Sequence, residues 1–276
     1  MLKKLKGTLL INGIGLAVLF VCLFGYQKVM SISSGQVVTI DFETLKEELH
    51  HYPKEELKKM LQAGEEILAW NALLAKTGSD VVNEVLKGQG MFWEMDHYPI
   101  QDTFDQETFS QYYYHAHRGG EHGHFHLFLR QGGMEKGMVP LLYDVRNDTL
   151  NDVDTYAHLI AISMSHQGHP LSLFTTNRWV TGEDWYASED VKKMLNRFSV
   201  NHAHPSYVVN QWLSAMLVLF RPQIDALIEE RDMALMRYAT GVPLKEILED
   251  QEFDVTSERP ISVAAQIEVL RTLLEE

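Results

Sequence analysis

The sequence predicts an α+β domain, in which antiparallel β-hairpins pack with helices, preceded by one N-terminal transmembrane helix. Three observations support this prediction: apolar residues at helical spacing in both outer thirds, strand-like segments in the middle, and an uncharged apolar run near the start. The chain has 276 residues, 45% of them hydrophobic, which is enough for one substantial core. We therefore expect residues 41–276 to form a single domain.

The N-terminal residues predict a membrane anchor. Residues 1–6 carry Lys3, Lys4 and Lys6, and residues 7–27 form an uncharged run of the length that a bilayer-spanning helix needs. The basic flank favours the cytoplasm, which would place the domain in the periplasm of a bacterial cell. A cleaved signal peptide is the alternative, and it would export the same domain. Residues 28–40 are expected to be a linker.

Helices are expected on both sides of the strands. Apolar residues recur at three- and four-residue steps, and Pro53, Pro205 and Pro222 suit the first turn of a helix. The predicted helical ranges are 41–78, 80–87, 188–198, 206–220, 222–238, 244–249 and 261–274. Strand pairs are expected at 111–130 and at 156–165 with 171–176, whereas 91–111 is expected to be irregular.

The segment 111–130 contains an unusual density of histidine. Five of the twelve residues that end at His126 are histidines, and Gly119-Gly120 between them favours a two-residue hairpin turn. With that turn, His117 faces His122, His115 faces His124, and Tyr113 faces His126. Because side chains alternate along a strand, all five histidines should share one side. Glu121 should point to the opposite side.

Histidines paired in this way predict a metal site. Paired residues across a hairpin bring their Cβ atoms within about 5 Å, which lets two imidazoles converge on one ion. We expect His115, His117, His122 and His124 to be the central ligands, with His126 farther from the turn. A pH-responsive or hydrogen-bonding face and incidental clustering are the alternatives. His202 and His204, which precede a predicted helix, are candidates for further ligands.

The available ligand atoms restrict the metal. Cys22 is the single cysteine and lies in the N-terminal apolar run, so the domain has no thiolate to offer. Imidazole ligands without thiolate suit Zn, Cu or Fe. If the protein is an enzyme, Glu183 and Glu121 are candidates for acid–base roles and Arg178 for binding an anion. His166 and His169 are expected at an exposed turn, and His158 is expected to be a packed strand residue.

The net charge bears on the partner. A formal charge of −14, with no cluster of Lys and Arg, argues against nucleic acid as a ligand. The membrane, reached through the N-terminal helix, is the expected partner. A membrane-protein complex is a second possibility.

Two resemblances bear on function. The spacing His115-x-His117-x-x-x-Glu121 matches part of the first cupin metal motif, although its flanking glycines and a second histidine motif are missing. Several segments together resemble a bacterial family of uncharacterised domains over roughly residues 50–235: YHAH at 114–117, EHGHFH at 121–126, FTTNRWVTGE at 174–183 and PQI at 222–224. That resemblance implies one domain and no particular activity.

Two hypotheses follow from the sequence. The first is a membrane-anchored, periplasm-facing protein that binds a transition metal through the hairpin, either as a metalloenzyme or as a metal-handling accessory protein. The second is a non-catalytic accessory subunit or interaction module of a larger membrane complex.

Overall fold

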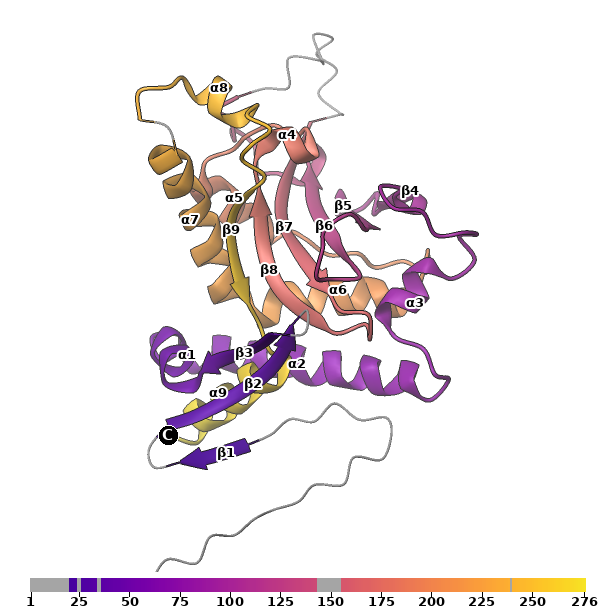
Figure 1. The fold of residues 1–276 in the computed structure, drawn as a ribbon, viewed down its shortest axis with the longest axis vertical. Helices are drawn as coiled ribbons and strands as arrows, with labels where there is room; N and C mark the ends of the chain where they lie inside the picture. Colours follow the sequence, from indigo (N-terminus) through magenta and orange to yellow (C-terminus); the bar gives the residue numbers. More distant parts are fainter. Residues whose placement is uncertain (1–19, 24–25, 34–35, 143–154, 239) are drawn as a thin grey trace, which may run out of the picture.

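The computed structural model describes residues 20–23, 26–33, 36–142, 155–238 and 240–276 (Figure 1). Its centre is a six-stranded sheet in which every neighbouring pair of strands is antiparallel. The spatial order is the chain order: β4 (Tyr98–Phe104), β5 (Ser110–His115), β6 (Gly123–Arg130), β7 (Tyr156–Met164), β8 (Pro170–Thr176) and β9 (Val255–Pro260). The predicted α+β class and both predicted hairpins are confirmed.

Most helices of the described chain lie in the predicted ranges, but the range 41–78 is divided between two helices, and the short helix at 178–181 was not predicted. Before the sheet come α1 (Phe42–Leu49), α2 (Lys54–Ala75) and α3 (Val81–Leu86), and after β8 come α4 (Arg178–Thr181), α5 (Ser188–Leu195), α6 (Tyr207–Leu219), α7 (Arg221–Tyr238), α8 (Leu244–Leu248) and α9 (Val263–Glu275). A short 3₁₀ turn, η1 (Gln131–Gly133), follows β6. Asp80 is the N-cap of α3 and Ser262 is the N-cap of α9; each side chain accepts a hydrogen bond from a backbone N–H of the first turn.

One face of the large sheet carries the main hydrophobic core. Helices α6 and α7 lie behind the sheet in Figure 1, and α2 crosses below it. Phe125 of β6 contacts Trp212 of α6 with ring centroids 6.4 Å apart, and the Tyr112 hydroxyl donates to Asn210 Oδ1 at 2.5 Å. All four side chains are fully buried. Because side chains alternate along β5 and β6, the neighbouring residues of both strands point to the opposite face.

Two strands of the large sheet were not predicted. Strand β4 lies in the segment expected to be irregular, and β9 pairs with β8 although helices α4 to α8 separate them in the chain. Both are edge strands, and both contain proline, which cannot donate to a sheet ladder. Their composition therefore lacks the alternation that identifies a strand from sequence.

The N-terminal segment differs from its expected form. Strands β1 (Phe20–Leu23), β2 (Tyr26–Ser33) and β3 (Gln36–Asp41) form a small antiparallel sheet, so the part of 7–27 that the structure describes is extended, and most of 28–40 is strand. Residues 1–19 lie outside the described residues. Among the helices that the structure describes, none combines the length and the apolar character needed to cross a membrane. The anchor stays a prediction.

Candidate metal centre

The register of β5 and β6 brings the histidines together. His115 pairs with His124, and Tyr113 pairs with His126, as the sequence predicts. Strand β7 pairs with the other edge of β6, and a bulge between Leu127 and Phe128 shifts its register. After this bulge, His158 of β7 lies opposite Phe128, which brings a further imidazole to the same face.

Three histidines form the centre of this cluster. In the part of the chain that the structure describes, His115, His124 and His126 are the one group of three or more potential ligands whose nitrogens all lie within 4.8 Å of one another. The side chains are buried, with 6%, 1% and 0% of their surface exposed. Nε2 of His115 and Nε2 of His124 are 2.7 Å apart. We refer to these three residues as the histidine triad; it could hold a metal ion.

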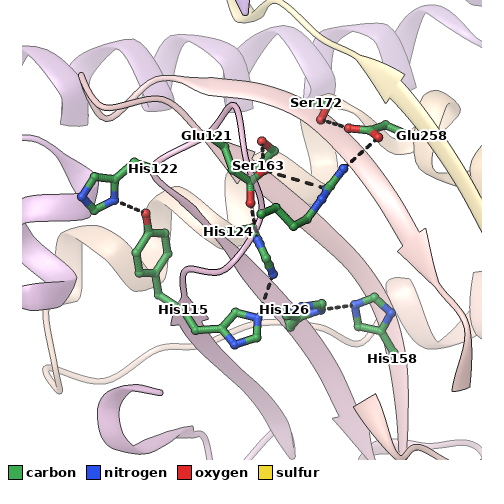
Figure 2. A network of polar contacts seen from close by, with 11 residues as sticks. His115, Glu121, His122, His124, His126, His158, Ser163, Ser172 and Glu258 are labelled. Carbon is green, nitrogen blue, oxygen red and sulfur yellow. Dashed lines mark hydrogen bonds and ion pairs between the residues drawn. The ribbon is translucent and has the colours of Figure 1, made fainter. Parts of the chain in front are cut away.

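The second ring nitrogen of His124 is held by a carboxylate. Figure 2 shows His124 between His115 and Glu121, whose Oε1 accepts a hydrogen bond from Nδ1. The other oxygen of Glu121 accepts from the Ser163 hydroxyl of β7. When Glu121 is ionised it can only accept, so Nδ1 of His124 then carries the proton and Nε2 keeps the lone pair that faces the triad. Metal-binding histidines commonly make this contact.

His126 is oriented in a similar way by another histidine. Its Nδ1 lies 3.0 Å from Nε2 of His158, which Figure 2 also shows, and Nδ1 of His158 lies 3.5 Å from the Thr176 hydroxyl. This chain is satisfied when His126 donates from Nδ1 and His158 donates to Thr176. Nε2 of His126 is buried and no described residue hydrogen-bonds it. A lone pair at this nitrogen is therefore available to a ligand.

The environment keeps the triad uncharged. Burial lowers the pKa of His115 and of His124 to about 2, and it lowers the pKa of His126 well below its ordinary value. Neighbouring imidazoles lower these pKa values further. Burial also raises the pKa of Glu121 to about 7, against the stabilising effect of the Ser163 hydrogen bond. Neutral imidazole is the form that binds a metal.

The predicted two-residue turn is wrong, and two side-chain positions change with it. Residues 116–122 form a wider loop, in which the His122 N–H donates to the Met164 carbonyl of β7 at 2.8 Å. His122 consequently lies on the core side, where its Nδ1 is 2.6 Å from the Tyr114 hydroxyl (Figure 2). Glu121, expected on the far face, instead contacts His124. The group of potential ligands therefore includes His126 in place of His117 and His122.

The remaining histidine candidates lie in different places. His117 is exposed at the edge of the triad. The backbone carbonyls of His202 and His204 accept hydrogen bonds from Asn210 of α6, on the core side of the sheet, so these residues do not join the triad. His166 is exposed at its turn, 5.3 Å from the ring of His122, and His169 is half-buried.

The other candidates for acid–base or anion-binding roles lie outside the histidine triad. Glu183 is buried and accepts a hydrogen bond from the backbone N–H of His158 at 2.5 Å. Its position therefore supports the strand that carries His158. Arg178, at the start of α4, is buried and forms an ion pair with Glu249. Neither residue belongs to the group of potential metal ligands.

Glu183 predicts a pH dependence of stability. Burial raises the pKa of Glu183 to about 8, so between its ordinary value and pH 8 the folded state keeps a proton that the unfolded state has lost. Stability should fall as pH rises through this window, by at most about 1.4 kcal/mol per pH unit. Glu183→Gln should flatten this slope in urea unfolding at pH 5 to 8. The exposed Glu252→Gln should not, and an unchanged slope in both variants would contradict the prediction.

The sequence did not identify two residues of this region. His97, which precedes β4, stacks on Tyr113 with ring centroids 3.6 Å apart, and it lies 5.6 Å from the ring of His115. Ser163 contacts Glu121 from β7. The alternation of β7 places Ser163 on one face, but only the long-range pairing of β6 with β7 shows that this face is the histidine face.

Comparison with known proteins gives a family and no activity. Neither the curated proteins nor the solved structures include a match to this chain. A family model does match residues 61–261, which cover most of the domain and include the whole histidine cluster. This match confirms the resemblance to an uncharacterised family. The chain belongs to the family described as a domain of unknown function, DUF6969.

Proposed function

We propose that this domain binds one transition-metal ion through Nε2 of His115, His124 and His126. The observation that supports the proposal best is the convergence of three buried imidazoles whose nitrogens lie within 4.8 Å of one another. In two of them the second nitrogen is already engaged, by Glu121 and by His158. Such contacts fix the tautomer and the ring orientation that a metal ligand needs.

The chemistry of the ligands supports a borderline metal. Three neutral nitrogen ligands without thiolate suit Zn²⁺, Cu²⁺ or Fe²⁺ better than Ca²⁺ or Mg²⁺, which prefer oxygen. The triad must adjust slightly on binding, because the hydrogen bond between His115 and His124 occupies the space where the ion would lie. Binding would also displace the proton that this hydrogen bond contains. Affinity should therefore come with proton release.

Metal handling and metal-dependent catalysis are both compatible with three histidines. Three protein ligands leave at least one coordination position for a water or a substrate, as in catalytic zinc sites. A metal-handling role needs only affinity for the ion and no open coordination position. We assign the function as metal binding. Whether the fourth position is open decides between the two roles.

The proposal can be tested by elemental analysis of the purified full-length chain. We expect about one metal ion per chain after incubation with Zn²⁺, Cu²⁺ or Fe²⁺ and removal of the excess. A chelator should remove the ion and lower the melting temperature. At a metal concentration 1,000 times Kd, the bound ion would stabilise the fold by about 4 kcal/mol.

The control is a variant that keeps the same number of buried histidines. His204→Ala removes an exposed histidine in the loop before α6 and should leave the metal content unchanged. A metal content far below one ion per chain for all three metals, with no thermal shift, would overturn the proposal.

A further inference from the structure

His117 is an exposed histidine whose ring lies close to two rings of the triad. Its ring centroid is 4.7 Å from that of His115 and 4.9 Å from that of His124. Within the triad, the corresponding distances are 4.5 Å, 4.8 Å and 5.1 Å. His117 is thus as close to two triad rings as these rings are to each other, yet its side chain is exposed, whereas theirs are buried.

This spacing matches that of imidazoles around a single ion. Four imidazoles bound at the usual metal–nitrogen distance of about 2.0–2.1 Å in a tetrahedron have ring centroids about 5 Å apart. The nitrogens of His117 lie outside the converging group, because that group contains only the triad. No described residue hydrogen-bonds its ring, and an exposed side chain changes rotamer within nanoseconds. Ring rotation can therefore turn a nitrogen toward the triad at little cost.

The backbone next to His117 is held in place, and the surrounding charges favour a cation. The carbonyl of Ala116 accepts a hydrogen bond from the Met95 N–H at 3.0 Å, which fixes the start of the loop. Glu94, Asp254 and Glu121 lie near enough to His117 to act on it electrostatically. The nearest positive charge, Arg118, is balanced by two carboxylates: its Nη2 lies 3.0 Å from Glu258 Oε2, and its Nη1 lies 3.8 Å from Glu121 Oε2.

From this arrangement we infer that His117 is the fourth ligand of the metal bound by the histidine triad, and that it closes the coordination sphere from the solvent side. The inference rests on the proposed metal site. A sphere of four protein nitrogens leaves a tetrahedral ion without a position for water, which is typical of structural and metal-holding sites rather than of catalytic ones. The inference therefore favours metal handling over catalysis. His117, being exposed, is also the ligand that an incoming ion meets first.

Cobalt and azide together test this inference. Co²⁺ replaces zinc in nitrogen sites, and its visible absorption reports the coordination number, while azide binds only where a position is open or held by water. The full-length wild-type protein with one Co²⁺ should show four-coordinate absorption that azide leaves unchanged. His117→Ala should bind Co²⁺ more weakly, by at least the roughly 10- to 100-fold that loss of an outer-shell partner costs. Its spectrum should also change with azide in a saturable way.

Two further variants make the test specific. His117→Asp returns a ligand atom to the same loop position and should restore a spectrum that is insensitive to azide. His204→Ala, also an exposed histidine, should behave as the wild type. Equal azide responses in the wild type and in His117→Ala would overturn the inference and leave the triad intact. Failure of the wild type to take up any Co²⁺, Zn²⁺, Cu²⁺ or Fe²⁺ would instead overturn the metal site itself.

Discussion

Changing His124 to alanine is expected to abolish stoichiometric metal binding. His124 is the central residue of the triad, because its Nε2 faces His115 and its Nδ1 bonds to Glu121. Alanine removes one of the three triad ligands and also leaves the Glu121 carboxylate without its imidazole. The measurement is the metal content of the purified full-length variant, together with its melting temperature with and without a chelator. Both the bound metal and the chelator-dependent shift should disappear.

The control for this prediction removes the charge of the carboxylate and keeps the ligand. Glu121→Gln leaves the three imidazoles in place, so the variant should still bind metal, with affinity lowered about 10- to 100-fold by the loss of the carboxylate. Circular dichroism would verify that both variants are folded. Full metal content in folded His124→Ala would show that the ion, if present, is held elsewhere.

Changing Phe125 to alanine is expected to destabilise the fold by about 3–5 kcal/mol while leaving the proposed metal site intact. The ring of Phe125 is fully buried on the core side of β6, with centroids 4.8 Å from Tyr114 and 6.0 Å from Tyr112. Truncation leaves a cavity that these aromatic neighbours cannot fill without moving the sheet. Urea unfolding at saturating metal measures the loss in free energy of unfolding. Elemental analysis measures the metal content per chain.

A second phenylalanine gives the matched comparison. Phe104 of the edge strand β4 is 37% exposed, so Phe104→Ala should cost roughly 1 kcal/mol or less. A loss of the same size in both variants would contradict the placement of Phe125 in the core. Loss of metal in folded Phe125→Ala would contradict the separation of the two faces of β6.

The alternation of β5 and β6 made most of the candidate site predictable. Histidine at every second position, on two strands joined by a short glycine-containing loop, is sufficient to pair His115 with His124 and to place His126 on the same face. The family resemblance was also predictable from these segments. Similarly, the apolar spacing of residues 54–75 and 221–238 was sufficient to predict α2 and α7.

The loop was not predictable from local rules. Gly119-Gly120 favours a two-residue turn, but within the described chain only Gly120 of this pair has a positive φ, at 89°. The bond from the His122 N–H to Met164 competes with that turn, and it depends on β7, which lies more than 30 residues farther along the chain. Because of this long-range contact, Glu121 turns toward His124 and His122 turns away. The contact between the Glu121 carboxylate and His124 therefore depends on tertiary structure and cannot be read from the local sequence.

The edge strands illustrate the same limit. Strand β9 contains Glu258, Arg259 and Pro260, which are residues that protect a sheet edge and carry no strand signal. Its pairing places Glu258 beside Phe174 and within reach of Arg118. The position of the Glu258 charge near this loop could consequently not be predicted from the sequence around the histidines.

The two faces of β6 also restrict which genetic changes the domain can accept. Phe125, Leu127 and Leu129 face the core, whereas His124 and His126 belong to the triad on the opposite face, and the strand is paired along both edges. An insertion or deletion of one residue within this strand would reverse every side chain beyond it, moving imidazoles into the core and apolar side chains to the histidine face. Point substitutions can alter either face separately. A change in the length of β6 would damage the hydrophobic core and the histidine triad together.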